Sequence, residues 1–551
     1  MTENRDRLSR RRGRCILFFE IFAICFILFL TYTHKPTVTI QNSQFWIEDG
    51  RTFIETPISN AKTIKETLLS SSWIHLFPSV RHMVTQIDEN VISHITNAKQ
   101  TTITLKGGNK FVVGNKLTAK IVAKDQLGRQ KNYGGDFFIV TLRRRGYQND
   151  VITCDVFDEM MGIYHVSCLL PWPGIAYLNA VLVHPSESIF QMIKKYSSEH
   201  EWGVLMNTTM RNSKDIDEYT PCSVGFPEKS PSELCDYSNP SHGEKWTCIK
   251  PESGECSSIT WQEKKTLEQI QFFDKTHFKR GLNLYAKITG SGTNISIAES
   301  SEKFKYLDEN LYETNENPFK STGWFDNGRW ISTVVPGEVS YSVERLQQCT
   351  TNKNFYFIGD STIRQWHEHF AKTLGIKQYG PDNSVAWSQH RDGSSESMNT
   401  SLHYRSHGSP LHNPGPVSSR PYISDSLDSI TNAGEGTYVF ITLGLHFELY
   451  DADIFGDRIR IIKSAVKSLL LRSHGVKIFI KGHNHHGYSK LCPSAWLSYR
   501  YDVMLRHEFK DIADVTYLSL WDLSIAADNR VLHPESNLLK TQIALFLSYI
   551  C

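Results

Sequence analysis

One serine in the C-terminal third of the chain stands where a buried strand meets a helix. An apolar run at residues 355–358 leads into Gly359-Asp360-Ser361, and the residues that follow have the apolar spacing of a helix. The first turn of a helix has free N–H groups that can stabilise an oxyanion. Ser361 is therefore a candidate nucleophile for acyl transfer, although Gly-Asp-Ser by itself also occurs in turns and helix caps.

Serine chemistry needs two partners, and both can come from the end of the chain. An imidazole must take the hydroxyl proton, and a carboxylate must orient that imidazole. His533 can supply the imidazole, whereas the carboxylate stays open between Asp528 and Asp522, which lie five and eleven residues before it. The sequence predicts a Ser-His-Asp centre whose acid is undecided.

A parallel sheet would bring these residues together. Apolar strands are expected at 437–443 and 476–481, and they lead into the polar loops Gly444-x-His446 and His483-Asn484. Ligands bind at the carboxyl ends of strands in open α/β sheets, so these four residues are expected to line the cleft. With a crossover helix at 458–471, the segment 346–551 is predicted to be an α/β domain. A metal site is disfavoured, because the loop histidines lack helical i, i+4 spacing and have no carboxylate nearby in the sequence.

The order of these motifs resembles that of a known superfamily. Gly359, Asp360 and Ser361, with Arg364 three residues on, resemble the opening motif of the SGNH-like PC-esterase superfamily. Because a strand-rich segment, a cysteine cluster and a hydrophobic N-terminus precede it, the whole chain is similar to the neurexophilin and PC-esterase domain (NXPE) family. The resemblance implies an SGNH-like, flavodoxin-like domain with a mostly parallel sheet. It also implies that Ser361 is the nucleophile and an oxyanion donor, and that His533 is the base.

Two positions depart from the superfamily pattern. Gly444 and His446 stand where many SGNH enzymes place a Gly-x-Asn oxyanion donor, and an imidazole donates with a different geometry from an amide. Arg530 stands three residues before His533, where the superfamily usually has the aspartate of Asp-x-x-His. The donor role of His446 and the identity of the acid both stay open.

The resemblance implies acyl-ester chemistry on a carbohydrate in the secretory pathway. The reaction would be O-acetyl transfer or O-acetyl ester hydrolysis, with no bound cofactor, acetyl-CoA as the donor and a sialylated glycoprotein glycan as the acceptor. The alternative, from the neurexophilin likeness, is a catalytically inactive, secreted or tethered ligand for a cell-surface protein. The net charge of +2 over 551 residues gives no global field that would attract nucleic acid.

The upstream chain is expected to contain a stem, a sandwich and a cysteine-rich region. Residues 37–100 are interpreted as the stem. Residues 101–195 show short alternating strands between turn signals, which is typical of an immunoglobulin-like β-sandwich. Residues 196–345 form the cysteine-rich, neurexophilin-like region.

The cysteines are spaced as a disulfide set would be. We expect a bridge between Cys154 and Cys168 inside the sandwich. Two more bridges are expected, with open connectivity, among Cys222, Cys235, Cys248 and Cys256. A zinc site there is disfavoured, because no Cys-x₂-Cys pair occurs. One further bridge is contested by Cys349, Cys492 and Cys551.

The N-terminus has the pattern of a membrane-targeting segment. A basic tail at 1–14 precedes an apolar run at 15–32, and its arginines favour the cytoplasmic side. We expect a single-pass type II signal anchor with the bulk of the chain in the Golgi lumen, and the alternative is a cleaved signal peptide with secretion. In that compartment the sequons become glycan acceptors at Asn207, Asn294 and Asn399.

Overall fold

The computed structural model describes residues 38–40, 43–48, 51–55, 63–87, 94–108, 110–197, 205–226, 229–264, 285–300, 320–335, 339–380, 389–407, 421–487 and 494–551. The chain divides into two compact units, Met1–Thr63 and Ile64–Cys551. The first contains an antiparallel sheet of β1 (Val38–Ile40), β2 (Ser43–Glu48) and β3 (Arg51–Glu55). The basic tail (1–14) and the expected anchor (15–32) lie outside the described residues. Within the described ranges, every helix is too short or too polar to span a bilayer.

The C-terminal part of the second unit is built on a six-stranded mixed sheet. Its spatial order is β22 (Arg391–Ser395), β23 (Thr400–Ser406), β21 (Asn354–Gly359), β24 (Thr437–Thr442), β25 (Lys477–Lys481) and β26 (Val515–Leu518). β22 is antiparallel to β23, and the remaining neighbours are parallel. β21, which leads into Ser361, is paired on both edges. The mostly parallel sheet is as predicted.

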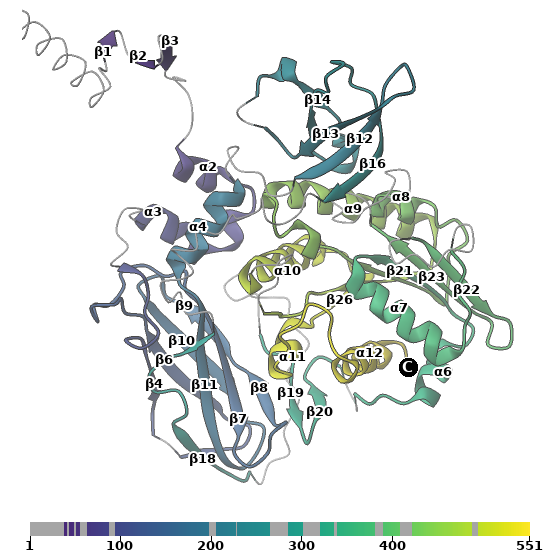
Figure 1. Ribbon diagram of the computed structural model, residues 1–551. Coiled ribbons are helices and arrows are strands. Elements are labelled where there is room, and N and C mark those ends of the chain that lie inside the picture. The colour runs from purple at the N-terminus through teal and green to yellow at the C-terminus, as the bar shows by residue number, and fades with distance from the viewer. Residues whose placement is uncertain are drawn as a thin grey trace, which may run out of the picture. The chain divides into compact units, whose positions relative to one another are not determined.

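Helices cover both faces of this sheet (Figure 1). They are α6 (Val343–Thr350), α7 (Ser361–Leu374), α8 (Ile423–Asp428), α9 (Ala452–Arg472), α10 (Ala495–Phe509), α11 (Trp521–Ala526) and α12 (Ser536–Ile550). Successive strand residues point to opposite faces. Phe355, Phe357 and Phe440 therefore pack with α6, α7 and α12, whereas Val439 and Ile441 pack with α8, α9 and α10. Burial on both faces explains why these strands are continuously apolar in the sequence.

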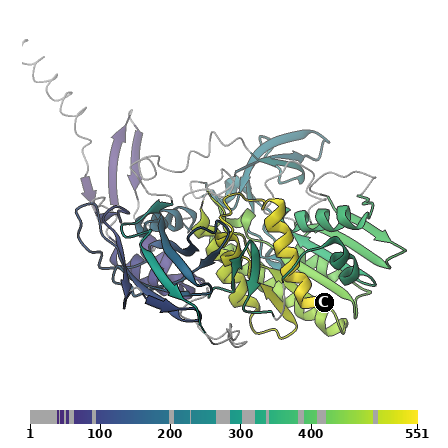
Figure 2. The same cartoon turned by 90° about the horizontal axis from the view of Figure 1, so that it is seen from below.

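A disulfide joins the two ends of the C-terminal domain. Cys349, near the end of α6, is bonded to Cys551 after α12, across a sequence separation of 202. The marked C-terminus in Figure 2 follows this last helix, drawn in yellow. Of the three cysteines that compete for this bridge in the sequence, Cys492 lies outside the described residues.

The predicted sandwich consists of two facing sheets. One contains β4 (Thr102–Lys106), β6 (Lys116–Val122), β10 (Ile163–Leu169) and β9 (Asp155–Asp158). The main strands of the other are β8 (Val151–Thr153), β7 (Phe137–Arg144), β11 (Gly174–His184), β18 (Asn294–Ala298) and β5 (Lys110–Val112). Leu117 and Ile121 of the first sheet meet Val140 and Leu182 of the second in one core. The expected Cys154–Cys168 bridge is present.

Later segments of the chain complete the larger sheet of the sandwich. The extra strands are β17 (Ala286–Lys287), β19 (Gly323–Asp326) and β20 (Arg329–Ser332). These strands and β18 fall in the segment 196–345 that the sequence assigns to the cysteine-rich region. The sandwich therefore uses more of the chain than 101–195, because strand pairing does not require neighbouring sequence.

Part of the expected stem belongs to the folded core. Three elements follow Thr63, and a fourth packs with them: α2 (Ile64–Ser70), η1 (Ile74–Leu76), α3 (Pro78–Gln86) and α4 (Ser186–Ser197). Leu68, Trp73 and Met83 are fully buried in the core shared with α9 and α10. The guanidinium of Arg500 lies 4.9 Å from the ring centroid of Trp73.

The cysteine-rich segment forms its own five-stranded sheet. Its order is β14 (Leu234–Asp236), β15 (Thr247–Ile249), β13 (Asp217–Ser223), β12 (Met206–Arg211) and β16 (Ser258–Lys264). The two expected bridges are present, and their connectivity is Cys222–Cys248 and Cys235–Cys256.

The three sequon asparagines are exposed in the folded chain. Asn207 lies on β12, Asn294 begins β18 and Asn399 precedes β23. Their glycosylation stays a prediction.

Candidate active site

Ser361 is the first residue of α7 and lies at the carboxyl end of a central strand. Asp360 caps the helix, because its Oδ1 accepts a hydrogen bond from the Thr362 N–H at 2.8 Å. Gly359 has φ +145°, and a Cβ there would lie 2.0 Å from the Thr442 carbonyl oxygen of β24. Only glycine allows this close strand contact, and it sets the direction in which Ser361 leaves the sheet.

His533 contacts Ser361 directly. Its Nε2 lies 2.7 Å from the Ser361 Oγ. Partial burial lowers the pKa of His533, and Arg364 and Lys481 act in the same direction, while Asp360 opposes them. The imidazole is therefore neutral at neutral pH, and its Nε2 can accept the hydroxyl proton.

Neither candidate aspartate reaches this imidazole, so the expected Ser-His-Asp triad is not assembled. Asp528 has φ +54°, its N–H donates to the Ile525 carbonyl at the end of α11, and its carboxylate pairs with Arg143 of the sandwich. The Asp528 carboxylate is thus held by Arg143, whereas the hydrogen bond of His533 is to Ser361. Asp522 is buried and accepts hydrogen bonds from the N–H and hydroxyl of Thr322.

Among the described residues, His533 has a hydrogen-bond partner in Ser361 alone. The arrangement is a Ser-His dyad.

Charged and polar side chains surround Asp360, the residue just before Ser361. Burial tends to raise the pKa of Asp360, but His446, Lys481, the Thr362 hydroxyl and His407 outweigh it, so its pKa lies below the usual range. The Lys481 Nζ donates to the Thr362 Oγ1 at 3.1 Å, and burial lowers its pKa to about 8. A carboxylate is thus held at the helix N-terminus by surrounding positive charge.

Sequence reasoning did not select Lys481 or His407. Both stand at the carboxyl ends of core strands, β25 and β23. A polar residue that ends an apolar strand is the signal that could have identified them.

The expected oxyanion donors differ in how the structure places them. The Ser361 N–H is at the first helical position and donates to no other group in the described part of the chain. The His446 ring lies beside that of His407, tilted by 32° with centroids 4.7 Å apart, and its charge acts on Asp360. Gly444 has φ +139°, and a Cβ there would lie 2.1 Å from the His483 ring. At Gly444 the loop after β24 therefore packs closely against the loop after β25.

His483 and Asn484 are buried supports, although the sequence suggests cleft positions. The His483 ring lies between the carbonyl oxygens of Leu443 and Ser498, at 2.7 and 3.0 Å. Asn484 accepts a hydrogen bond from Gln542 at 2.7 Å and is only 4% exposed. Their polar groups hold loops to helices instead of facing solvent.

Arg364 lies one helical turn after Ser361 on α7. Its guanidinium is 3.8 Å from the Glu368 carboxylate, and Arg391 contacts the same carboxylate at 2.8 Å. Arg364 and Glu368 both influence the pKa of His533, with opposite signs. Arg364 therefore brings positive charge near His533, and Glu368 partly offsets its effect.

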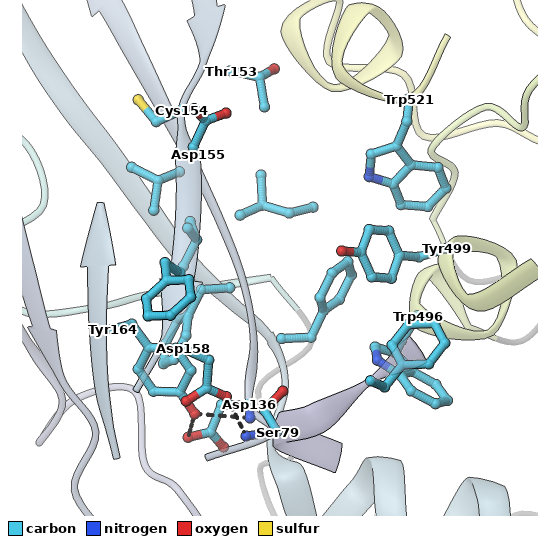
Figure 3. A pocket seen from close by; sticks show the side chains of 18 of the residues that line it. Ser79, Asp136, Thr153, Cys154, Asp155, Asp158, Tyr164, Trp496, Tyr499 and Trp521 are labelled. Atoms are coloured by element: carbon cyan, nitrogen blue, oxygen red, sulfur yellow. Dashed lines mark hydrogen bonds between the residues drawn. The ribbon is translucent and has the colours of Figure 1, made fainter. Parts of the chain in front are cut away.

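A separate cavity of about 330 Å³ lies between the sandwich and the C-terminal helices (Figure 3). Its lining contains neither Ser361 nor His533. Trp496, Tyr499 and Trp521 face Asp155 and Asp158 across it. Burial raises the pKa of Asp155 to about 6 and that of Asp158 to about 7.

Two protein-family models match separate parts of this chain. Residues 330–551 match the family model described as NXPE family member 4-like, C-terminal domain, and residues 83–270 match the Neurexophilin family model. Among solved structures, the crystal structure of the Lin-41 filamin domain is similar to 16% of this chain at 15% identity. That match covers 82% of the filamin chain, with a TM-score of 0.14. The two family matches do not overlap and together cover most of the chain, which therefore belongs to the neurexophilin and PC-esterase domain (NXPE) family.

Proposed function

We propose that this chain is a serine-dependent acyl-ester enzyme that adds acetyl groups to glycans or removes them. The observation that carries the proposal is the 2.7 Å contact between the Ser361 Oγ and the His533 Nε2. A serine at the first turn of a helix, beside a neutral imidazole, is the arrangement that acyl transfer needs. Membership of the NXPE family supports the hypothesis of an esterase-like protein.

The chemistry follows from the positions of the dyad. The neutral His533 takes the hydroxyl proton while the Ser361 oxygen forms a bond to the acetyl carbonyl carbon. The developing oxyanion accepts from the Ser361 N–H, and the positive end of α7 stabilises it. His533 then returns the proton to the leaving group, which is the thiol of acetyl-CoA in transfer and a sugar hydroxyl in hydrolysis. A sugar hydroxyl or water, deprotonated by His533, then forms a bond to the acetyl carbonyl carbon, the bond from that carbon to the Ser361 oxygen breaks, and His533 returns the proton to Ser361.

The surroundings support an anionic glycan as the acceptor or substrate. Arg364 lies one helical turn after Ser361 and acts on the pKa of His533, so a sialic acid carboxylate bound beside the dyad would be attracted by its positive charge. We propose sialylated glycoprotein glycans, with acetyl-CoA as the acyl donor and no bound cofactor.

We propose the secretory pathway as the compartment. Four disulfides occur among the described residues, and such bonds persist in oxidising compartments. A type II anchor at 15–32 in the Golgi membrane is the proposed attachment, and secretion is the alternative.

The test uses the full chain, as wild type and as Ser361→Ala, with isotope-labelled acetyl-CoA and a sialylated glycan. Mass spectrometry should find label on the glycan with the wild type and none with the variant. The hydrolytic reaction, release of acetate from an O-acetylated glycan by water, is measured in parallel. If neither reaction depends on Ser361, the enzyme proposal fails.

A second candidate function is favoured by one specific observation, the Neurexophilin match over residues 83–270. In this reading the chain is a tethered or secreted ligand for a cell-surface protein, and the missing triad acid reflects a retained scaffold. Saturable binding to cells that is equal for wild type and Ser361→Ala, together with no acetyl transfer or release, would support it. Acetyl chemistry without any saturable cell binding would exclude it.

A further inference from the structure

The loop that carries His533 is held on both sides, although no carboxylate in the described ranges hydrogen-bonds to the imidazole. On one side, the Pro534 carbonyl accepts a hydrogen bond from the Gln365 Nε2 at 3.1 Å, which ties the loop to α7. On the other side, the Arg530 carbonyl accepts from the Gly487 N–H at 2.9 Å. The loop is therefore clamped between the helix of Ser361 and the loop after β25.

His485 is the next element of this clamp. The Asn529 side chain donates to the His485 carbonyl at 2.6 Å, and the Asn529 carbonyl faces the His485 Nδ1 at 2.9 Å. A carbonyl only accepts, so Nδ1 carries the ring proton. Burial lowers the pKa of His485 to about 3 and keeps the ring neutral. Its Nε2 must then be an acceptor.

The Tyr285 hydroxyl lies between this nitrogen and a backbone carbonyl, and its single proton is donated to the carbonyl of His486 and shared at most in part with the His485 Nε2. The hydroxyl lies 3.1 Å from the His485 Nε2 and 2.9 Å from the His486 carbonyl. The Tyr285 ring lies 3.9 Å from the guanidinium carbon of Arg530, a cation–π contact. Tyr285 therefore touches two residues that fix the chain just before His533.

The backbone of Tyr285 is strained, and its sequence position links it to the sandwich. It has φ +60°, which a bulky residue adopts only where its surroundings impose it. It directly precedes β17, whose Lys287 pairs with Val181 of the sandwich strand β11. The Arg143–Asp528 ion pair is a second link between the sandwich and the same loop.

We propose that Tyr285 is a positioning residue for the Ser361–His533 pair. It acts through His485 and Arg530, and it does the orienting that a triad aspartate does elsewhere. The proposal makes the sandwich part of the active-site frame. It rests on the proposed function only in requiring that His533 serve as the base for Ser361.

The test measures the reactivity of Ser361 without any natural substrate. An alkyl fluorophosphonate forms a bond between the serine Oγ and phosphorus, fluoride leaves, and His533 accepts the proton. The full chain is prepared as wild type, Ser361→Ala, Tyr285→Phe, Tyr285→Leu and the control Tyr219→Leu, an exposed tyrosine on the cysteine-rich sheet. Labelling rates are recorded as a function of pH.

We expect Tyr285→Leu to slow labelling about tenfold, because small misplacements of reacting groups cost large factors in rate. Tyr285→Phe keeps the ring beneath Arg530, so its loss should be smaller, about threefold. In both variants the looser loop is better solvated, and the pH midpoint should move up toward that of ordinary histidine. Tyr219→Leu should leave rate and midpoint unchanged.

Several outcomes separate this inference from the proposed function. If Tyr285→Leu reduces secretion or thermal stability, Arg530→Leu replaces it, since Arg530 is exposed and its loss should give the same shift in midpoint. If a folded Tyr285 or Arg530 variant is labelled at the wild-type rate and with the wild-type pH midpoint, the inference is overturned and the enzyme proposal stands. A labelled wild type that neither adds nor removes glycan acetyl groups would sink the proposed function, while slow labelling of Tyr285→Leu would still support positioning. A wild type that never reacts at Ser361 would overturn both.

Discussion

The disulfide between Cys349 and Cys551 offers a prediction whose size follows from the chain. The bond closes a loop with a sequence separation of 202. In the chain-entropy account, a 100-residue loop contributes about 4.7 kcal/mol, and a doubling of length adds about 0.6 kcal/mol, so this bond should stabilise its domain by about 5 kcal/mol. For a domain of this size, each kcal/mol corresponds to roughly 2–4 °C in Tm.

Cys551→Ser is the sharpest perturbation of this bond. Cys551 is exposed, so the change removes the cross-link with little loss of packing and leaves the buried Cys349 in place. We expect the Tm of the C-terminal domain, measured by calorimetry, to fall by about 10–20 °C. Asn537→Ser, an exposed change on the same helix, is the matched control and should shift Tm by less than about 2 °C. A fall of only a few degrees in Cys551→Ser would refute the reasoning, because the unfolded chain would then already be compact.

Three further predictions concern the dyad and the buried acids. His533→Ala should lower the rate of Ser361 labelling by about a thousandfold or more, and an unchanged rate would exclude a base role for the imidazole. Labelling should rise with pH through a midpoint below 6.5, since the pKa of His533 is lowered by burial and by neighbouring cations. Arg364→Gln should move this midpoint up and Glu368→Gln should move it down, and shifts of the same sign would contradict the electrostatic account. For Asp155 the folded-state pKa of about 6 is above the unfolded value, so its contribution to stability is full at low pH and is lost as pH rises through about 6. The stability of Asp155→Asn relative to wild type should therefore rise by about 1.4 kcal/mol between pH 5 and 7.5, and a difference in urea midpoint that is the same at both pH values would count against this account.

The local parts of the site were predictable from short stretches of sequence. A strand that is apolar at every position must be buried on both faces, and Gly359-Asp360-Ser361 directly after it indicates a turn into a helix. The expectation that Ser361 and His533 meet came from the need of a serine nucleophile for an imidazole and was supported by the family resemblance, whereas their spacing of 172 residues gave no signal. His483 and Asn484 were assigned to the cleft because they follow a strand, yet the loop turns both side chains inward.

The strands of the sandwich show a second limit of prediction from sequence. Alternation in 101–195 indicates its strands, but β17 to β20 are too short, and too far along the chain, for their partners to be read from sequence. Lys481 and His407, two of the residues that act on Asp360, were missed for a similar reason, because each comes from a different strand end.

By itself the sequence determined the class of each region, the strand leading to the serine and the number of disulfides that most of the cysteines form, since these depend on periodicity and composition. Tertiary structure alone decided that neither Asp528 nor Asp522 meets His533, and that Cys349 pairs with Cys551. It also placed Tyr285 against Arg530 and His485. The physical reason is the range of the interaction. A strand or helix is set by contacts within a few residues, whereas the partner of a carboxylate, a thiol or an imidazole is set by packing between segments far apart in the chain.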